Sequence, residues 1–301
     1  MALMSKLMFN PLQNKSICCI INTPCRISAG CVFLCGVLFM NKVGVIGAGN
    51  MASAILFGLL KSGIVTKEHL SVSDKDEAKL AVFEREGIFT SADNSDIADR
   101  AEVVLIAVKP NIYPFVLDEL KEYKGKVFVS IAPGISIDTI EQQLYSGAKI
   151  VRTMPNTPAQ VNAGMTVLCK SGSVTEEEFS YVRKLFDTLG KTMELPEKLM
   201  SASVAVNGSG PAYVFMMIEA MADAAVLFGI PRKEAYQLAA QTVAGSAEMV
   251  LKTGKHPAEL KDMVCSPGGT TIEAVSVFEE KGFGGVVIDA MKKCKEKAEG
   301  K

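Results

Sequence analysis

The sequence has only two histidines, His69 and His256, and neither lies near a serine that could act as a nucleophile. A catalytic serine-histidine triad is therefore excluded. The sequence also lacks any group of histidines, cysteines and carboxylates at metal-ligand spacing, so we expect no metal site. His256 precedes Pro257 at the predicted start of a helix, where we expect it to cap the helix or lie at the surface.

A strong charge of either sign is also missing. The 301 residues include 32 Lys and Arg and 33 Asp and Glu, which gives a formal net charge of -1. This balance offers neither a basic field for nucleic acid nor an acidic tail. We therefore expect the partners to be a small-molecule substrate and further copies of the chain, with no nucleic acid.

Cysteine is scarce outside the start of the chain. Five of the eight cysteines lie in the first forty residues, and the other three are Cys169, Cys265 and Cys294. These three are widely spaced and form no CxxC pair, a pattern typical of a reduced, cytosolic protein. We predict a cytoplasmic location.

Residues 1–39 differ in composition from the rest of the chain, with three basic residues and no acid. A signal peptide or anchor would explain the apolar run Cys31–Met40, but this run is too short to span a bilayer and no small-residue cleavage site follows. An organelle transit peptide would explain the absence of acids, although Arg and Ser are few. We favour a third interpretation, in which Met40 is the true start, residues 1–39 are a leader outside the fold, and the protein does not bind a membrane.

From Lys42 onward, short apolar runs such as "KVGVIG" and "EVVLIAV" alternate with helical patterns. Runs of Val and Ile without polar alternation indicate strands buried on both faces, and hence a parallel sheet covered by helices. The sequence therefore predicts a doubly wound, Rossmann-type α/β domain over residues 40–203.

Beyond Gly210 no strand pattern remains, and Pro211, Pro231 and Pro257 mark the starts of successive helices. We predict an all-helical domain over residues 204–301. Its first helix carries only two charged residues, four positions apart, so most of its circumference is apolar and must be buried. A small helical domain cannot cover that surface alone, which indicates a homodimer as the smallest stable unit.

The segment "VGVIGAGNMASAI" reads as a strand, a Gly47-x-Gly49-x-x-Ala52 turn and a helix. This order predicts dinucleotide binding, with the pyrophosphate resting on the helix N-terminus. At the end of the second strand, Asp74 could accept ribose hydroxyls and favour NAD, whereas Ser73 and Lys75 could hold a 2′-phosphate and favour NADP. These residues alone leave the two cofactors open.

Further loops lie at the predicted carboxyl edge of the sheet, where ligands of such domains bind. They include "AVKP", "SIAPGISI" and "RTMPNTPAQVNAG". Later, "VCSPGGTTIEAV" places a Pro-Gly-Gly turn and three hydroxyls directly before a helix. Without a nucleophile or a metal, the chemistry we expect is hydride transfer by the cofactor, with the protein supplying orientation and polar contacts.

Five segments taken in order resemble pyrroline-5-carboxylate reductase, the last enzyme of proline biosynthesis. They are "GVIGAGNMASAI", "AVKP", "RTMPNTPAQVNAG", "GSGPAYVF" and "LKDMVCSPGGTTIEAV". The resemblance extends from Lys42 to about Lys295. It implies reduction of (S)-1-pyrroline-5-carboxylate to L-proline with NADPH or NADH, with NADPH the more usual cofactor, by obligate homodimers that assemble into decamers.

The resemblance also implies roles for individual residues. The Ser-Pro-Gly-Gly loop would hold the substrate carboxylate opposite the nicotinamide bound by the neighbouring subunit, and Thr271, the catalytic residue, would hydrogen-bond near the imine nitrogen. The implied substrate-binding residues are Ser266, Gly268, Gly269, Thr270 and Thr271. The implied cofactor-binding residues are Gly47, Gly49, Asn50, Met51, Ser73, Lys75, Asn94, Ala107, Lys109, Pro110, Ala132 and Gly134.

Two positions depart from the family pattern: Gly254 stands where Glu is frequent, and Asn207 stands where Ser is usual. A rival interpretation is a β-hydroxyacid dehydrogenase, but its catalytic lysine is typically followed by Asn three or four residues later, which no lysine between residues 252 and 261 satisfies. A second rival is a protein that binds NAD(P) without turnover, against which the intact carboxylate loop argues.

Overall fold

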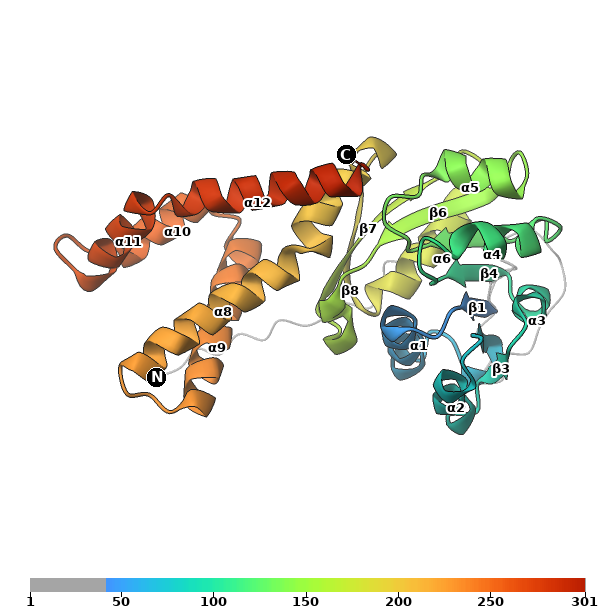
Figure 1. Cartoon of the computed structure of the whole chain (residues 1–301), viewed down its shortest axis with the longest axis horizontal. Helices are drawn as coiled ribbons and strands as arrows, with labels where there is room; N and C mark the ends of the chain where they lie inside the picture. Colours follow the sequence, from blue (N-terminus) through green and yellow to red (C-terminus); the bar gives the residue numbers. More distant parts are fainter. Residues whose placement is uncertain (1–41, 301) are drawn as a thin grey trace, which may run out of the picture. The chain divides into compact units, whose positions relative to one another are not determined.

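The computed structural model describes residues 42–300 (Figure 1). Residues 40–301 group into one compact unit. The interpretations of residues 1–39 as signal peptide, transit peptide or leader fall outside the described residues.

The described residues form one eight-stranded sheet with the order β3-β2-β1-β4-β5-β6-β7-β8. The strands are β1 (Val43–Ile46), β2 (Leu70–Ser73), β3 (Phe89–Ser91), β4 (Val103–Ile106), β5 (Val127–Ser130), β6 (Lys149–Met154), β7 (Gly164–Lys170) and β8 (Gly190–Glu194). Strand β1 pairs in parallel with both β2 and β4. The chain therefore reverses its direction of winding between β1 and β4, the point at which such sheets bind nucleotides.

The sequence predicted a parallel sheet, but the sheet is mixed because β7 pairs antiparallel to β6. Strand β8 runs parallel to β7, so these two strands oppose the other six. The reason lies in the short connection 155–163, which holds only the 3₁₀ turn η2 (Thr157–Val161). A parallel pair needs a crossover of a dozen or more residues, usually a helix, so this connection can only turn the chain back.

Helices cover both faces of the sheet. They are α1 (Asn50–Ser62), α2 (Glu77–Arg85), α3 (Asn94–Arg100), α4 (Tyr113–Leu120), α5 (Ile137–Leu144) and α6 (Glu176–Asp187), with a 3₁₀ turn η1 (Lys67–His69) before β2. Helices α1, α2 and α6 share one buried cluster, and α3, α4 and α5 share another. The sequence patterns indicated neither β3 nor α3, because the half-buried "FTS" is too short to form an apolar run.

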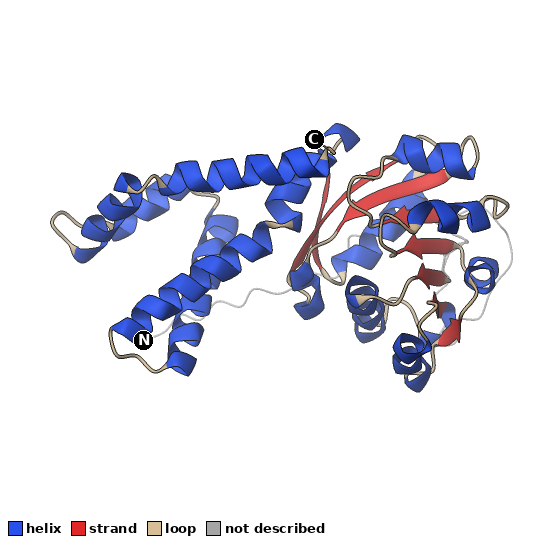
Figure 2. Ribbon diagram, in the orientation of Figure 1, coloured by secondary structure: helices blue, strands red, loops and turns tan. Residues whose placement is uncertain are grey.

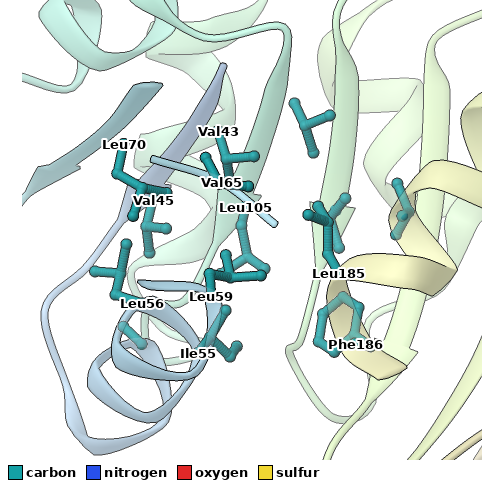
Figure 3. Packing of buried hydrophobic residues seen from close by; sticks show 14 of the residues in the cluster. Val43, Val45, Ile55, Leu56, Leu59, Val65, Leu70, Leu105, Leu185 and Phe186 are labelled. Atoms are coloured by element: carbon teal, nitrogen blue, oxygen red, sulfur yellow. The ribbon is translucent and has the colours of Figure 1, made fainter. Parts of the chain in front are cut away.

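The first cluster fixes the strands that carry the glycine-rich turn (Figure 3). Val45 of β1 and Leu105 of β4 pack with Leu56 and Leu59 of α1, and all four are at most 3% exposed. Burying an aliphatic side chain of this size contributes about 1.5–3 kcal/mol. The close packing of these side chains thus fixes the positions of the carboxyl ends of β1 and β4.

After β8 the described chain is entirely helical, as predicted (Figure 2). The elements are η3 (Glu197–Leu199), α7 (Met200–Ser203), the π-helical turn η4 (Val204–Gly208), α8 (Gly210–Leu227), α9 (Arg232–Thr253), α10 (Pro257–Val264), α11 (Thr270–Glu280) and α12 (Phe283–Ala298). Gly254 ends α9 in the left-handed conformation, with φ 65°. A glycine adopts that conformation without strain, so Gly254 suits this helix end.

The capping role predicted for His256 is confirmed. It is the N-cap of α10, and its Nδ1 accepts a hydrogen bond from the backbone N–H of Ala258 at 3.2 Å. The π-helical turn was not predicted. Such turns occur as single interruptions of α-helices, frequently at functional sites.

The helices after residue 209 bury little of their apolar surface. Their described core is three alanines, Ala222, Ala235 and Ala239. Large apolar side chains such as Phe215 and Leu251 are exposed. In the described part of the chain, one helical stretch, Glu197–Leu227, is long and apolar enough to cross a membrane by length and composition. This surface matches the apolar surplus that the sequence predicted for the first helix of the domain.

Candidate active site

The glycine-rich turn joins β1 to α1 and needs glycine at Gly47 for two reasons. Its φ is 99°, and a Cβ there would lie 2.7 Å from the carbonyl oxygen of Ala107. Gly49, the N-cap of α1, differs in that a Cβ would meet nothing within 4 Å. The open space in front of Gly49 leaves room for a ligand to approach the backbone.

The N-terminus of α1 is suited to an anion. No side chain caps it and its first turn contains no acid, whereas Asp76, Asp93, Ser136 and Thr175 each cap a helix of the same described domain. The first backbone N–H groups of a helix have no partner within it, and the helix dipole adds positive potential there. A pyrophosphate group therefore fits this turn.

A cleft of about 510 Å³ lies beside the turn. Its lining residues are Ile46, Gly47, Gly49, Ser73, Asp74, Lys75, Lys79, Asn94, Ala107, Val108, Lys109, Ile112, Phe115, Val116 and Glu119. The cleft thus brings together seven of the predicted cofactor residues: Gly47, Gly49, Ser73, Lys75, Asn94, Ala107 and Lys109. They come from the carboxyl ends of β1, β2 and β4 and the start of α3, as expected for a Rossmann-type fold.

Asp74 connects the end of β2 to the glycine-rich turn. Its Oδ2 accepts a hydrogen bond from the backbone N–H of Ala48 at 2.8 Å, and its Oδ1 accepts one from the N–H of Asp76 at 2.9 Å. Charge-assisted bonds of this kind are stronger than neutral ones. The carboxylate is therefore held in one orientation and helps to fix the turn that receives the phosphates.

Ser73 has a different partner from the 2′-phosphate proposed for it. The residue is 0% exposed, and its hydroxyl donates to Oδ1 of Asn94 at 2.7 Å. The amide of Asn94 in turn donates to Oε2 of Glu119 at 2.6 Å. The side chain of Asn94 is thereby oriented from both sides at the wall of the cleft.

The other predicted cofactor residues are not among the residues that line the cleft. Asn50 and Met51 form the first turn of α1, and Pro110 follows Lys109 directly. Ala132 is buried and its N–H lies 3.3 Å from the hydroxyl oxygen of Ser130. Gly134 has φ 77°, and a Cβ there would lie 3.6 Å from the carbonyl oxygen of Ala298 in α12.

Sequence reasoning missed several residues of the cleft, including Lys79, Ile112 and Phe115. Phe115 lies on α4 and is 70% exposed. An apolar residue on the outer face of a helix directly after the β4 loop is a signal that could have indicated it. The ring of Phe115 lines the same cleft as Asn94 and Glu119, and an exposed aromatic ring is suited to stack on an adenine.

The Ser-Pro-Gly-Gly segment forms a tight reverse turn before α11. The backbone N–H of Gly269 donates to the carbonyl oxygen of Ser266 at 3.0 Å, and Gly268 has φ 68°. Proline in the second position and a left-handed glycine in the third are the residues that a type II turn requires. The sequence therefore dictates this turn.

The same turn presents polar groups at the start of a helix. Gly269 is the N-cap of α11, no side chain caps this helix in the described chain, and Thr270 and Thr271 are its first residues. The hydroxyl of Ser266 lies over Gly269, within 2.2 Å of the place where a Cβ would be. Free N–H groups and hydroxyls at a helix start suit a carboxylate.

The nucleotide cleft and the Ser-Pro-Gly-Gly turn are separate features of a single chain. All the described residues that line the cleft lie between Ile46 and Glu119, and the turn belongs to the exposed connection between α10 and α11. Among residues 42–300, no group of three or more His, Cys, Asp and Glu residues could hold a metal ion. Burial raises the pKa of the Cys169 thiol to about 12, which makes it a poor nucleophile.

Comparisons with known proteins agree with this division. Residues 197–301 match the family described as pyrroline-5-carboxylate reductase dimerisation, and residues 42–134 match the family described as NADP oxidoreductase, coenzyme F420-dependent. The fold class predicted from the sequence, a Rossmann-type domain followed by a helical dimerisation domain, is thus confirmed.

Two relatives named pyrroline-5-carboxylate reductase match this chain over nearly their whole length. The chain is 50% identical to the Escherichia coli K12 protein over 262 residues, which are 86% of this chain and 97% of that relative. It is 40% identical to the Arabidopsis thaliana protein over 259 residues, 83% of this chain and 91% of the relative.

Solved structures show the same similarity. The Plasmodium falciparum pyrroline carboxylate reductase with NADP bound is 34% identical, with a TM-score of 0.79 over 86% of this chain and 97% of that one. The pyrroline-5-carboxylate reductase of Coxiella burnetii is also 34% identical, with a TM-score of 0.80 and the same coverage. The chain therefore belongs to the pyrroline-5-carboxylate reductase family.

Proposed function

We propose that the protein reduces (S)-1-pyrroline-5-carboxylate to L-proline with NADPH, the last step of proline biosynthesis. The observation that carries this proposal is the 50% identity to the Escherichia coli enzyme over 97% of that enzyme's length. The chain has both parts that the reaction needs, a nucleotide cleft and a turn that suits a carboxylate.

The cleft fits NADPH. The open space before Gly49 and the uncapped start of α1 suit the pyrophosphate, which Gly47, Gly49, Asn50 and Met51 would hold. Asn94 would contact the adenosine. The nicotinamide riboside would lie along Ala107, Lys109, Pro110, Ala132 and Gly134. The Plasmodium falciparum relative binds NADP, which supports NADPH as the cofactor. NADH would bind the same residues.

When bound, the cofactor supplies a hydride to C5 of the imine. The chain's own residues bind and orient the substrate. The N–H groups of Gly268 and Thr270 and the hydroxyl of Ser266 would hold the carboxylate, and Gly269, whose own N–H closes the turn onto Ser266, would shape the site around it. The hydroxyl of Thr271 would position a proton at the ring nitrogen. Because the imine can take up its proton in solution before it binds, the reaction would need no strong general acid.

Most of the rate enhancement would then come from orientation. Holding two reactants in a productive geometry can contribute about 7–11 kcal/mol to lowering a barrier. Loops and hydroxyls carried on rigid helices and strands are sufficient for that task. This view agrees with the poor reactivity expected of the buried Cys169.

The active unit would be an obligate homodimer in which the turn of one subunit faces the cleft of its neighbour, and such dimers would assemble into a decamer. The exposed apolar side chains of α8, α9 and α11 and the match of residues 197–301 to a dimerisation family support this assembly. We place the domain boundary at residues 203 and 204, inside the helical stretch Glu197–Leu227. Burial of that stretch between subunits, rather than in a membrane, would suit a cytoplasmic enzyme.

A steady-state assay tests the function. Purified protein is mixed with pyrroline-5-carboxylate and NADPH, loss of NADPH is followed by absorbance, and proline is measured directly. We expect one proline for each NADPH consumed. NADPH binding without turnover would instead favour a nucleotide-sensing protein, and turnover of β-hydroxyacids would favour the rival dehydrogenase.

A further inference from the structure

We infer that Lys79, a residue of α2 that lines the cleft, determines the selectivity of the cleft for a cofactor with a 2′-phosphate. The inference deepens the proposed function and depends on the cleft binding a dinucleotide. It rests on the contacts that the neighbouring side chains at the end of β2 already make.

Ser73 is not available to a phosphate. It is fully buried, and its hydroxyl donates to Asn94. Breaking that bond would leave a buried acceptor without its partner, which costs about 1–3 kcal/mol. The hydroxyl that the sequence placed at the 2′-phosphate therefore serves to orient Asn94.

Asp74 opposes a phosphate at the same place. Its carboxylate is fixed by the N–H groups of Ala48 and Asp76, so it cannot swing away without freeing the glycine-rich turn. Its side chain remains 17% exposed in the cleft. A 2′-phosphate close to this carboxylate needs cations that offset the repulsion between like charges.

Lys75 provides one such cation but has a partner already. Its Nζ donates to the carbonyl oxygen of Ala92 at 2.8 Å, in the segment between β3 and α3. This bond fixes the ammonium on the side of the cleft formed by that segment. A phosphate can still approach the ammonium, because an ammonium has three donors.

Lys79 is the second cation, and it is held loosely. Its Nζ lies 3.7 Å from Oδ1 of Asp74 and 3.5 Å from Oδ2 of Asp76, and its side chain is 48% exposed at the cleft. Exposed ion pairs of this length contribute little, about 0–1 kcal/mol. The ammonium can therefore exchange its contacts with the carboxylates for contacts with a phosphate at little cost.

The charges of the side chains at this end of the cleft explain the role of Lys79. Asp74, Asp76 and, beside Lys75, Asp93 carry negative charges here, and Lys75 and Lys79 carry positive ones. Without Lys79 a single lysine faces these carboxylates, so this end of the cleft would repel a 2′-phosphate, whereas the ribose hydroxyls of NADH would be unaffected. Loss of Lys79 should thus separate the two cofactors, as loss of Lys75 should.

The test measures binding rather than turnover. Dissociation constants for NADPH and NADH, and for the fragments 2′,5′-ADP and 5′-AMP, are measured by calorimetry on the full chain and on three variants. We expect Lys79→Ala to weaken NADPH and 2′,5′-ADP by about tenfold, equivalent to about 1.4 kcal/mol, and to change NADH and 5′-AMP less than twofold. Lys79→Arg, which keeps the charge, should retain most of the preference.

Lys184→Ala on α6 is the matched control, an exposed lysine outside the cleft lining whose removal should change neither nucleotide. Equal weakening of NADPH and NADH by Lys79→Ala, or no effect on either, would overturn the inference and leave the proposed function standing. A parent protein that binds neither nucleotide would overturn both.

Discussion

The side-chain amide of Asn156 donates a hydrogen bond to the backbone carbonyl oxygen of Asn207, 51 residues further along the chain, at 3.0 Å. The side chain of Asn207 donates in return to the carbonyl oxygens of Met154 and Met165 at 2.9 and 3.1 Å. Oδ1 of Asn156 accepts from the N–H of Met165 at 2.9 Å. The two asparagines thus connect the ends of β6 and β7 to the π-helical turn that precedes α8.

Asn207→Ala should lower the free energy of unfolding by about 2–3 kcal/mol, because two carbonyl oxygens lose their donor. Asn207→Ser, which restores the residue usual in the family, should cost less, since a hydroxyl can donate to one of them. Urea denaturation measures both, with Gln143→Ala on the exposed face of α5 as the control. An unchanged midpoint for Asn207→Ala would show that this connection contributes nothing to stability.

Stability should fall in alkaline solution. Burial raises the pKa of Cys169 from about 9 to about 12 and that of Tyr181 from about 10 to about 12. Burial also raises the pKa of Tyr113. The folded state therefore keeps protons that the unfolded chain loses above about pH 9, so the free energy of unfolding should decrease from pH 9 toward pH 12 and be independent of these groups below pH 8.

Tyr181→Phe separates this effect from general alkaline damage. The hydroxyl of Tyr181 is buried and has no hydrogen-bond partner among the described residues, so its removal should not destabilise the protein at pH 7. It should make the decrease above pH 9 shallower. Denaturation curves measured at pH 7, 9 and 10.5 would reveal this, and parallel decreases in parent and variant would contradict it.

Lys75→Ala should raise the KM for NADPH by about tenfold and that for NADH much less, since a charge-assisted contact with the 2′-phosphate is lost. Initial rates with both cofactors on parent and variant measure the effect. If KM rises equally for the two, the ammonium serves only to hold the carbonyl oxygen of Ala92.

A chain that begins at Met40 should be soluble, oligomeric and as active as the full chain. The described residues begin at Lys42, and β1 begins at Val43 with four buried residues. Size-exclusion chromatography and the steady-state assay on both chains measure this. An insoluble or inactive product would show that residues 1–39 contribute to the fold.

Local patterns predicted much of this structure, and contacts between distant residues account for what they missed. The apolar runs around Val45, Leu105 and Val129 indicated buried strands because burial on both faces leaves no polar alternation. The antiparallel pairing of β7 depends on the length of a connection rather than on strand composition. No local pattern could show that the hydroxyl of Ser73 faces Asn94, 21 residues away.

In the candidate site, too, local patterns predicted some residues and missed others. The glycine-rich turn and the Ser-Pro-Gly-Gly turn could be predicted because glycine and proline dictate backbone shape locally. Lys79 and Phe115 could not, since each lies on an ordinary helix and reaches the cleft only through the packing of α2 and α4 on the sheet.

Thr271→Val should lower kcat by about tenfold to a hundredfold and leave the dissociation constant of NADPH nearly unchanged. The hydroxyl of Thr271 lies at the start of α11, outside the lining of the nucleotide cleft, and valine keeps a similar shape while removing the donor. Losing a hydrogen bond to a charged group costs about 1.5–3 kcal/mol, which corresponds to that range of rates. Single-turnover rates and NADPH titrations separate the two effects. Thr271→Ser, which keeps the hydroxyl, should recover most of the rate, and equal rates for Thr271→Val and the parent would remove Thr271 from the mechanism.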